Sequence, residues 1–194
     1  VGCIKSKAVP VLINHTINEK YFSKLLVTYK PEYIFLPTGM SQFIPNGSEI
    51  YSYNRYTLFK TIYKTDYAIH EDLALLLTTS GSTGSHKFVR QSYKNINSNA
   101  EAIAQYLGIT STDRPISTMP MSYTFMLSII NSHLLKGASI ILTNATLMEK
   151  HFWRAIKDNN ATTFGGVPYI FEMLKKLRFE NMNLPSIKYI TQAG

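Results

Sequence analysis

Residues 73–89 constrain this chain more than any other stretch of its sequence. They read LALLLTTSGSTGSHKFV, so that five apolar residues, Leu73 to Leu77, are followed by eight residues that are only Thr, Ser or Gly. An apolar run without alternation predicts a strand buried on both faces, which is typical of parallel sheets. We therefore expect a strand that ends where the Thr, Ser and Gly residues begin.

The loop that follows has the composition of an anion-binding loop. Its glycines, Gly81 and Gly84, allow positive φ and close approach of a ligand to the backbone. The hydroxyl side chains and Lys87 add donors and a positive charge, and no Asp or Glu occurs from Leu73 to Ala100. A polyphosphate is the expected ligand.

The spacing within this loop differs from two common phosphate-binding patterns. Two residues separate Gly81 from Gly84, and Lys87 follows Ser85 and His86, so neither the Walker pattern nor GxGxxG fits. A short stretch rich in Ser, Thr and Gly can also be a polar linker. Residue types alone leave that alternative open.

The order of the residues is more informative than their types. Residues 79–87, TSGSTGSHK, resemble the phosphate loop of the adenylate-forming (AMP-binding) superfamily, which includes acyl-CoA synthetases, aryl-CoA ligases and nonribosomal adenylation domains. That family usually reads TSGSTGxPKG, so His86 stands at the usual Pro and Phe88 at the usual Gly. The hydroxyl and glycine core and the lysine match.

The resemblance implies activation of a carboxylic acid by ATP and Mg²⁺, giving acyl-AMP and pyrophosphate. Transfer to a thiol would follow, either CoA or the phosphopantetheine of an acyl-carrier protein. Thr83 and Lys87 are the implied catalytic residues. The implied nucleotide-binding residues are Thr79, Ser80, Gly81, Ser82, Thr83, Gly84 and Lys87 for the phosphates, and Gln192, Ala193 and Gly194 for the adenine side.

The same resemblance limits what this chain does alone. Residues 1–194 are expected to be part of the N-terminal AMP-binding domain, with the phosphate loop at 78–87 and the C-terminal domain absent. The family's magnesium Glu, ribose Asp and C-terminal lysine are not found in this sequence. The parent enzyme, and not the 194-residue chain, is therefore expected to be active, with Mg²⁺ held mainly outside this chain.

The segment that begins at Pro120 suggests the kind of acid. Acyl-CoA synthetases usually read Pro-Leu-Phe-His here, so Tyr123 is implied at the mouth of the carboxylate pocket, and Met126 is a second substrate candidate. Both could instead be packing residues of a buried helix. No Asp or Glu lies between Ser117 and His133, so a buried α-ammonium would lack a counter-charge. A fatty or other apolar acid is expected rather than an amino acid.

Strand and helix patterns alternate along the chain and predict an α/β fold with a largely parallel sheet flanked by helices. The expected strands are 8–13, 33–36, 73–77, 115–119, 138–143, 162–167 and 187–191, with strands or a hairpin in 38–66. The expected helices are 19–29, 92–107, 124–135, 147–159 and 168–178. Residues 8–36 are interpreted as a βαβ unit.

Composition narrows the class of protein. The net charge of +8 could indicate a nucleic-acid surface, but the lysines are scattered, so no nucleic acid is expected. No apolar run approaches the ~20 residues of a membrane span. The five histidines lack metal spacing. The single cysteine, Cys3, suggests a reducing cytoplasm and a buried thiol.

The alternative to an enzyme is a non-catalytic nucleotide-binding or interaction module of the same fold.

Overall fold

A computed structural model describes the chain except for residues 1, 15, 45, 65–66, 79–87 and 194. The chain divides into two compact units, Val1–Arg90 and Gln91–Gly194. Each unit has its own cluster of buried apolar side chains. The two clusters share no residue, so each unit has a core of its own.

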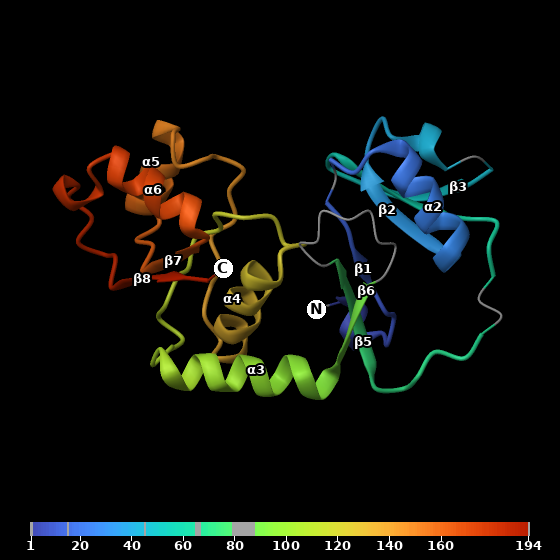
Figure 1. Ribbon diagram of the computed structural model, residues 1–194, viewed down its shortest axis with the longest axis horizontal. Helices are drawn as coiled ribbons and strands as arrows, with labels where there is room; N and C mark the ends of the chain where they lie inside the picture. Colours follow the sequence, from blue (N-terminus) through green and yellow to red (C-terminus); the bar gives the residue numbers. More distant parts are fainter. Residues whose placement is uncertain (1, 15, 45, 65–66, 79–87, 194) are drawn as a thin grey trace. The chain divides into compact units, whose positions relative to one another are not determined.

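The first unit contains two three-stranded sheets (Figure 1). Its elements are α1 (Gly2–Lys5), β1 (Val11–Leu12), α2 (Glu19–Tyr29), β2 (Tyr33–Pro37), a 3-10 turn (Ser41–Phe43), β3 (Ser48–Tyr53), β4 (Tyr56–Lys60), β5 (Leu73–Thr78) and β6 (Phe88–Ser92). One sheet has the order β1-β5-β6 and the other β2-β4-β3. Because β1 and β2 lie in different sheets, the predicted βαβ unit is wrong.

The apolar run forms the strand that it predicts. Within β5, Ala74, Leu75 and Leu77 are buried, and the strand pairs in parallel with β1 through Val11 and Leu12. β6 follows residues 79–87 in the chain and was not predicted. Its five residues, FVRQS, are too short and too polar to give a strand pattern.

The second sheet of this unit is antiparallel throughout. β4 pairs antiparallel with both β2 and β3, and Asn54 adopts a positive φ of 54° in the turn that joins β3 to β4. This confirms the predicted hairpin. The predicted α/β fold is also confirmed, but its strand pairing is mixed and not purely parallel, because β1–β5 and β7–β8 are parallel and this sheet is antiparallel. A two-residue turn can join only antiparallel neighbours.

Helix α2 has the predicted bounds because signals lie at both of its ends. The N-cap side chain of Asn18 accepts a 2.8 Å hydrogen bond from Tyr21 N, and Lys30 ends the helix in the left-handed region at φ 42°. Phe22 and Leu26 on this helix pack against the buried cluster of the antiparallel sheet. That cluster consists of Ile34, Leu36, Ile44 and Phe59.

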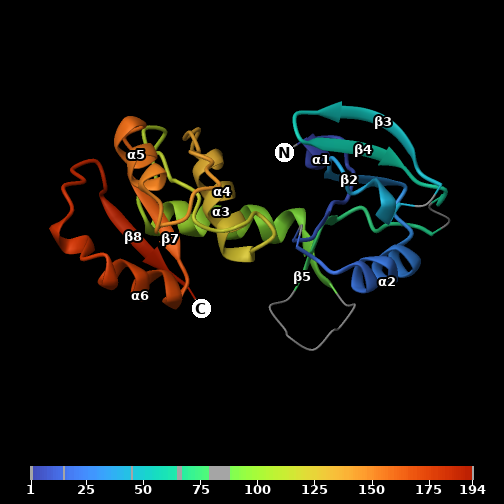
Figure 2. The ribbon, with the colours of Figure 1, turned by 90° about the horizontal axis from the view of Figure 1, so that it is seen from above.

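The second unit is mostly helical, with a short parallel strand pair (Figure 2). Its elements are α3 (Tyr93–Tyr106), α4 (Thr124–Leu135), α5 (Lys150–Asp158), β7 (Thr163–Gly166), α6 (Pro168–Lys176), a 3-10 turn (Phe179–Asn181) and β8 (Tyr189–Gln192). All of these helices and both strands were predicted, α4 with identical bounds. Ser92 caps α3 in a capping box with Asn95, as its sequence signal indicates.

Two predicted strands of this unit are reduced to single bridges. Residues 115–119 and 138–143 pair only as Pro115 with Thr163 and Ile116 with Ile141, both in parallel. Proline lacks the N–H that a longer ladder would require at residue 115. The apolar sequence of both segments is nevertheless buried in part, since Ile116 has no exposed surface.

The core of the second unit is built on aromatic side chains. Phe152 lies edge-to-face with Trp153 at 5.2 Å and with Phe164 at 6.2 Å between ring centroids. Helix α4 is less buried than its apolar sequence predicts, because Leu134 and Leu135 are exposed. No helix among the described residues is both long and apolar enough to cross a bilayer.

Candidate functional site

The predicted phosphate loop lies between two described strands. β5 ends at Thr78 and β6 begins at Phe88. The candidate residues Thr79, Ser80, Gly81, Ser82, Thr83, Gly84 and Lys87 lie outside the described residues, and so does Gly194. Their roles in nucleotide binding therefore stay predictions.

The predicted adenine-side residues follow the last strand. Gln192 ends β8 opposite Gly166, and the backbone N of Ala193 donates to the Gly166 carbonyl at 3.3 Å. Both residues are exposed. The backbone here is held by β7, the Gln192 side chain is exposed, and the adenine-side role stays a prediction.

The two substrate candidates have different environments. Tyr123 is the N-cap residue of α4, its carbonyl accepts from Leu127 N at 3.0 Å, and its side chain is exposed. Met126 has no exposed surface. Tyr123 is thus on the surface, whereas Met126 occupies the core position that was the alternative interpretation, and the substrate role of Tyr123 stays a prediction.

An apolar pocket lies in the second unit between two helices and the strand pair. Its volume is about 170 Å³. The lining comes from the end of α3 (Ile103, Tyr106 and Leu107), from α4 (Phe125, Ser128, Ile129, Ser132 and His133), from β7 (Thr163, Phe164 and Gly165) and from β8 (Tyr189 and Thr191). None of these residues is Asp, Glu, Lys or Arg, so the pocket suits an uncharged apolar group.

The pocket could not be located from the sequence alone. Its walls come from four segments that are far apart in the chain, and most of the lining residues match ordinary helix or strand patterns. One signal was present, because two adjacent glycines, Gly165 and Gly166, interrupt a predicted strand. Glycine inside a strand often marks a close approach of a ligand or of other atoms.

The histidine at the pocket wall is buried and neutral. His133 is 2% exposed, and its Nδ1 lies 2.8 Å from the Ile129 carbonyl oxygen. A carbonyl only accepts, so Nδ1 carries the proton and donates. Burial lowers the pKa of His133, against the opposing effects of this hydrogen bond and of Asp113. In the neutral ring Nε2 is an acceptor, and it has no partner among the described residues.

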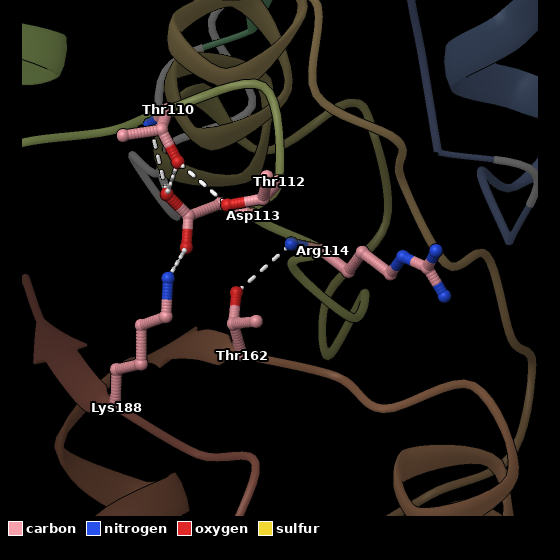
Figure 3. A network of polar contacts seen from close by, with 6 residues as sticks. All are labelled: Thr110, Thr112, Asp113, Arg114, Thr162 and Lys188. Carbon is pink, nitrogen blue, oxygen red and sulfur yellow. Dashed lines mark hydrogen bonds and ion pairs between the residues drawn. The ribbon is translucent and has the colours of Figure 1, made fainter.

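A buried carboxylate anchors the start of β8 (Figure 3). Asp113 is 2% exposed, and Lys188 Nζ lies 2.7 Å from its Oδ1. Its Oδ2 accepts from the N and Oγ1 of Thr110, at 2.8 and 3.1 Å. Burial raises the pKa of Asp113, but hydrogen bonds from Lys188 and Thr110 outweigh it and lower the pKa to about 2. The network therefore holds an ionised carboxylate at neutral pH.

A second contact joins the same turn to the start of β7. Arg114 N donates to Thr162 Oγ1 at 2.8 Å, just before β7 begins. Together with the Asp113 network, this fixes the turn after α3 to the starts of both strands that line the pocket. The network is structural and does not enter the pocket, since none of its residues belongs to the lining.

The environment of Cys3 differs from the expectation, and the described part of the chain has no cluster of potential metal ligands. Cys3 is exposed, so the expectation of a buried thiol is wrong; it lies in the short helix α1, which buries no residue. No group of three or more His, Cys, Asp or Glu that could hold a metal occurs among the described residues.

Comparison with known proteins identifies the family to which this chain belongs. The model of the family "AMP-binding enzyme" matches residues 1–194, and the chain belongs to this family. This confirms the resemblance that the loop sequence suggested. The chain is 34% identical over 76 residues to 2-succinylbenzoate–CoA ligase of Bacillus velezensis, a match covering 39% of this chain and 16% of that protein.

A more distant relative is also named as a CoA ligase. The long-chain-fatty-acid–CoA ligase FadD13 of Mycobacterium tuberculosis is 23% identical over 125 residues, which is 64% of this chain and 25% of that protein. This chain thus matches no more than a quarter of the length of these two relatives.

Solved structures show the same fold. The o-succinylbenzoate CoA synthetase MenE of Bacillus subtilis, solved with its acyl-adenylate OSB-AMP, gives a TM-score of 0.74 at 20% identity, covering 99% of this chain and 50% of that one. The N-terminal domain of FACL13 from Mycobacterium tuberculosis gives 0.57 at 22% identity, covering 63% of this chain and 31% of that one. The fold is that of the N-terminal domain of adenylate-forming enzymes.

Proposed function

We propose that residues 1–194 are part of the N-terminal domain of an AMP-forming acid–thiol ligase. The parent enzyme would convert a carboxylic acid and ATP into acyl-AMP and pyrophosphate, and would then transfer the acyl group to CoA or to a carrier pantetheine. Family membership supports this reaction type. The observation that carries the proposal is the uncharged apolar pocket in a chain that also contains the TSGSTG loop sequence.

The loop residues would bind the polyphosphate of ATP. Hydroxyl and backbone N–H donors together with Lys87 suit the β and γ phosphates, whose charge must be balanced while the carboxylate attacks the α phosphorus and pyrophosphate leaves. Each charge-assisted hydrogen bond could contribute about 1.5–3 kcal/mol. Mg²⁺, when bound, balances phosphate charge, and we expect its protein ligands mainly outside this chain.

The acid would be apolar and would lack an α-ammonium group. The pocket lining contains no carboxylate, and none occurs between Ser117 and His133. An unpaired buried ammonium would cost several kcal/mol, whereas an alkyl or aryl group carries no such penalty. An apolar acid would be consistent with a place in fatty acid metabolism, which stays a prediction, as does the cytoplasmic location suggested by the single cysteine.

Pyrophosphate release by the parent protein tests the reaction and the acid together. With ATP and Mg²⁺, octanoate is expected to support faster pyrophosphate release than leucine. Faster release with leucine would contradict the proposed acid class. ATP binding without pyrophosphate release from any acid would support the non-catalytic alternative instead.

Substitutions in the loop test the phosphate assignment. Lys87→Ala and Thr83→Val in the parent protein are expected to lower kcat/KM about ten- to a thousandfold, equivalent to about 1.4–4 kcal/mol. Both substitutions are expected to leave the thermal unfolding midpoint unchanged. Full activity in both variants would mean that the stretch is a polar linker. The 194-residue chain alone is expected to bind ATP weakly and to release no pyrophosphate.

A further inference from the structure

Gly165 forms a point of very close approach between β7 and α4. A Cβ atom built on this glycine would lie 2.5 Å from Ile129 Cδ1 and 2.9 Å from Phe125 Cζ. Real Cβ atoms essentially never approach other heavy atoms below 3.0 Å. The two α4 side chains therefore occupy space that any other residue at position 165 would need.

The strand cannot easily move away from α4. Thr118 Oγ1 donates a hydrogen bond to the Gly165 carbonyl, and Gly165 pairs with Thr191 in the β7–β8 ladder. The φ of Gly165 lies outside the left-handed region, so alanine is compatible with the backbone there. A side chain at position 165 would displace Phe125 and Ile129 instead, and both of these line the pocket.

We infer that Gly165 is a specificity-determining residue that sets the size of the pocket, which takes one apolar group about as large as a benzene ring. The pocket volume of about 170 Å³ is close to the ~150 Å³ of engineered apolar cavities that bind benzene. That this group is the acyl or aryl part of an acid rests on the proposed function. The size limit itself rests only on the pocket geometry.

Benzene binding tests the size limit without any catalysis. We expect benzene to raise the unfolding midpoint of the purified parent protein, and Gly165→Ala to weaken benzene binding at least tenfold. Gly166→Ala is the matched control, because its Cβ would meet Ile170 at 2.5 Å, and Ile170 does not line the pocket. Gly166→Ala is expected to lower stability while the benzene Kd stays unchanged.

A second variant keeps the test decisive if Gly165→Ala does not fold. Phe125→Leu shortens the side chain that Gly165 accommodates, so it should enlarge the pocket and allow naphthalene to bind. In a folded Gly165→Ala protein, adding Phe125→Leu should restore benzene binding. Equal benzene affinity in wild type and Gly165→Ala, or no effect of Phe125→Leu on naphthalene binding, would overturn the inference.

Acid preference in the parent protein links the pocket to the reaction. Gly165→Ala should lower kcat/KM for hexanoate at least tenfold more than for acetate, whereas Gly166→Ala should lower both equally. An unchanged ratio, with benzene binding lost, would overturn the assignment of this pocket to the acyl group. If no acid gives pyrophosphate while Gly165→Ala still loses benzene, the proposed function fails and the size limit stands.

Discussion

The antiparallel sheet of the first unit and strand β7 of the second unit bury their residues in opposite ways. On β2, β3 and β4 the aromatic side chains of Tyr33, Phe35, Tyr51, Tyr53 and Tyr56 are exposed. On β7 all four residues are buried, although two of them are glycine and one is threonine. Residue type therefore does not decide burial in this chain.

The difference follows from what covers each sheet. β2 alternates between exposed and buried residues, and its inward residues, Ile34 and Leu36, pack with Phe22 and Leu26 of α2. β7 instead carries Phe164 into the aromatic core and presents Gly165 to Phe125 and Ile129 of α4. A strand covered on both faces needs no alternation, whereas a half-covered antiparallel strand shows it.

The largest expected effect on stability is at a fully buried residue in the core of the second unit. Phe152→Ala removes a ring with no exposed surface from the aromatic core and should lower the free energy of unfolding by about 3–5 kcal/mol. Tyr53→Ala, at a ring that is 61% exposed, should change it by less than about 0.5 kcal/mol. Denaturant unfolding of both variants measures the contrast. Similar losses in both would mean that the outer face of β3 is covered in solution.

A second contrast concerns polar pairs. Asp113→Asn removes the carboxylate that binds Lys188 and Thr110 and should cost about 1.5–3 kcal/mol of stability. The hydrogen bond from Ser52 to Glu49 is exposed, so Glu49→Gln is expected to leave stability unchanged. Chemical denaturation at pH 7 compares the two variants directly. An equally small effect of Asp113→Asn would contradict a stabilising role for the network.

The same carboxylate predicts a dependence on pH. The folded-state pKa of Asp113 is lowered from 3.8 to about 2, so its contribution is present above pH 4 and is lost as the pH falls from about 4 to about 2. The loss amounts to about 2 kcal/mol by the conversion of pKa into free energy. Asp113→Asn should remove this part of the acid-induced loss. A pH profile that is unchanged in the variant would show that other carboxylates account for the loss.

The smallest expected effects are those of helix capping, which can be compared at one helix N-terminus in each unit. Asn18→Ala and Ser92→Ala should each lower stability by about 1 kcal/mol. Ser92→Ala should cost slightly more, because Ser92 Oγ also donates to Asn95 Oδ1 at 2.8 Å and so helps to hold the capping box. Thermal unfolding of both variants provides the measurement. A larger loss for Asn18→Ala would show that the hydrogen bond from Ser92 Oγ to Asn95 contributes nothing.

Local signals in the sequence were sufficient for several elements. The bounds of α2 and α4 were predicted, and β5 formed from its continuous apolar run. The TSGSTGSHK sequence was sufficient to indicate the AMP-binding family, which the family comparison confirmed. These predictions succeed because caps, helical period and loop motifs depend on residues within a few positions of one another.

The tertiary structure decided what depends on distant segments. Nothing local indicates that β2 pairs antiparallel with β4 instead of parallel with β1, or that residues 115–119 make only isolated bridges. Asp113 and Lys188 are 75 residues apart, and the pocket needs α3, α4, β7 and β8 together. Such contacts depend on which faces of the helices and strands become covered when distant segments pack together. The alternation of side chains along one strand does not carry that information. The sequence thus determined the family and the local elements, whereas strand pairing and the size of the pocket were decided by packing.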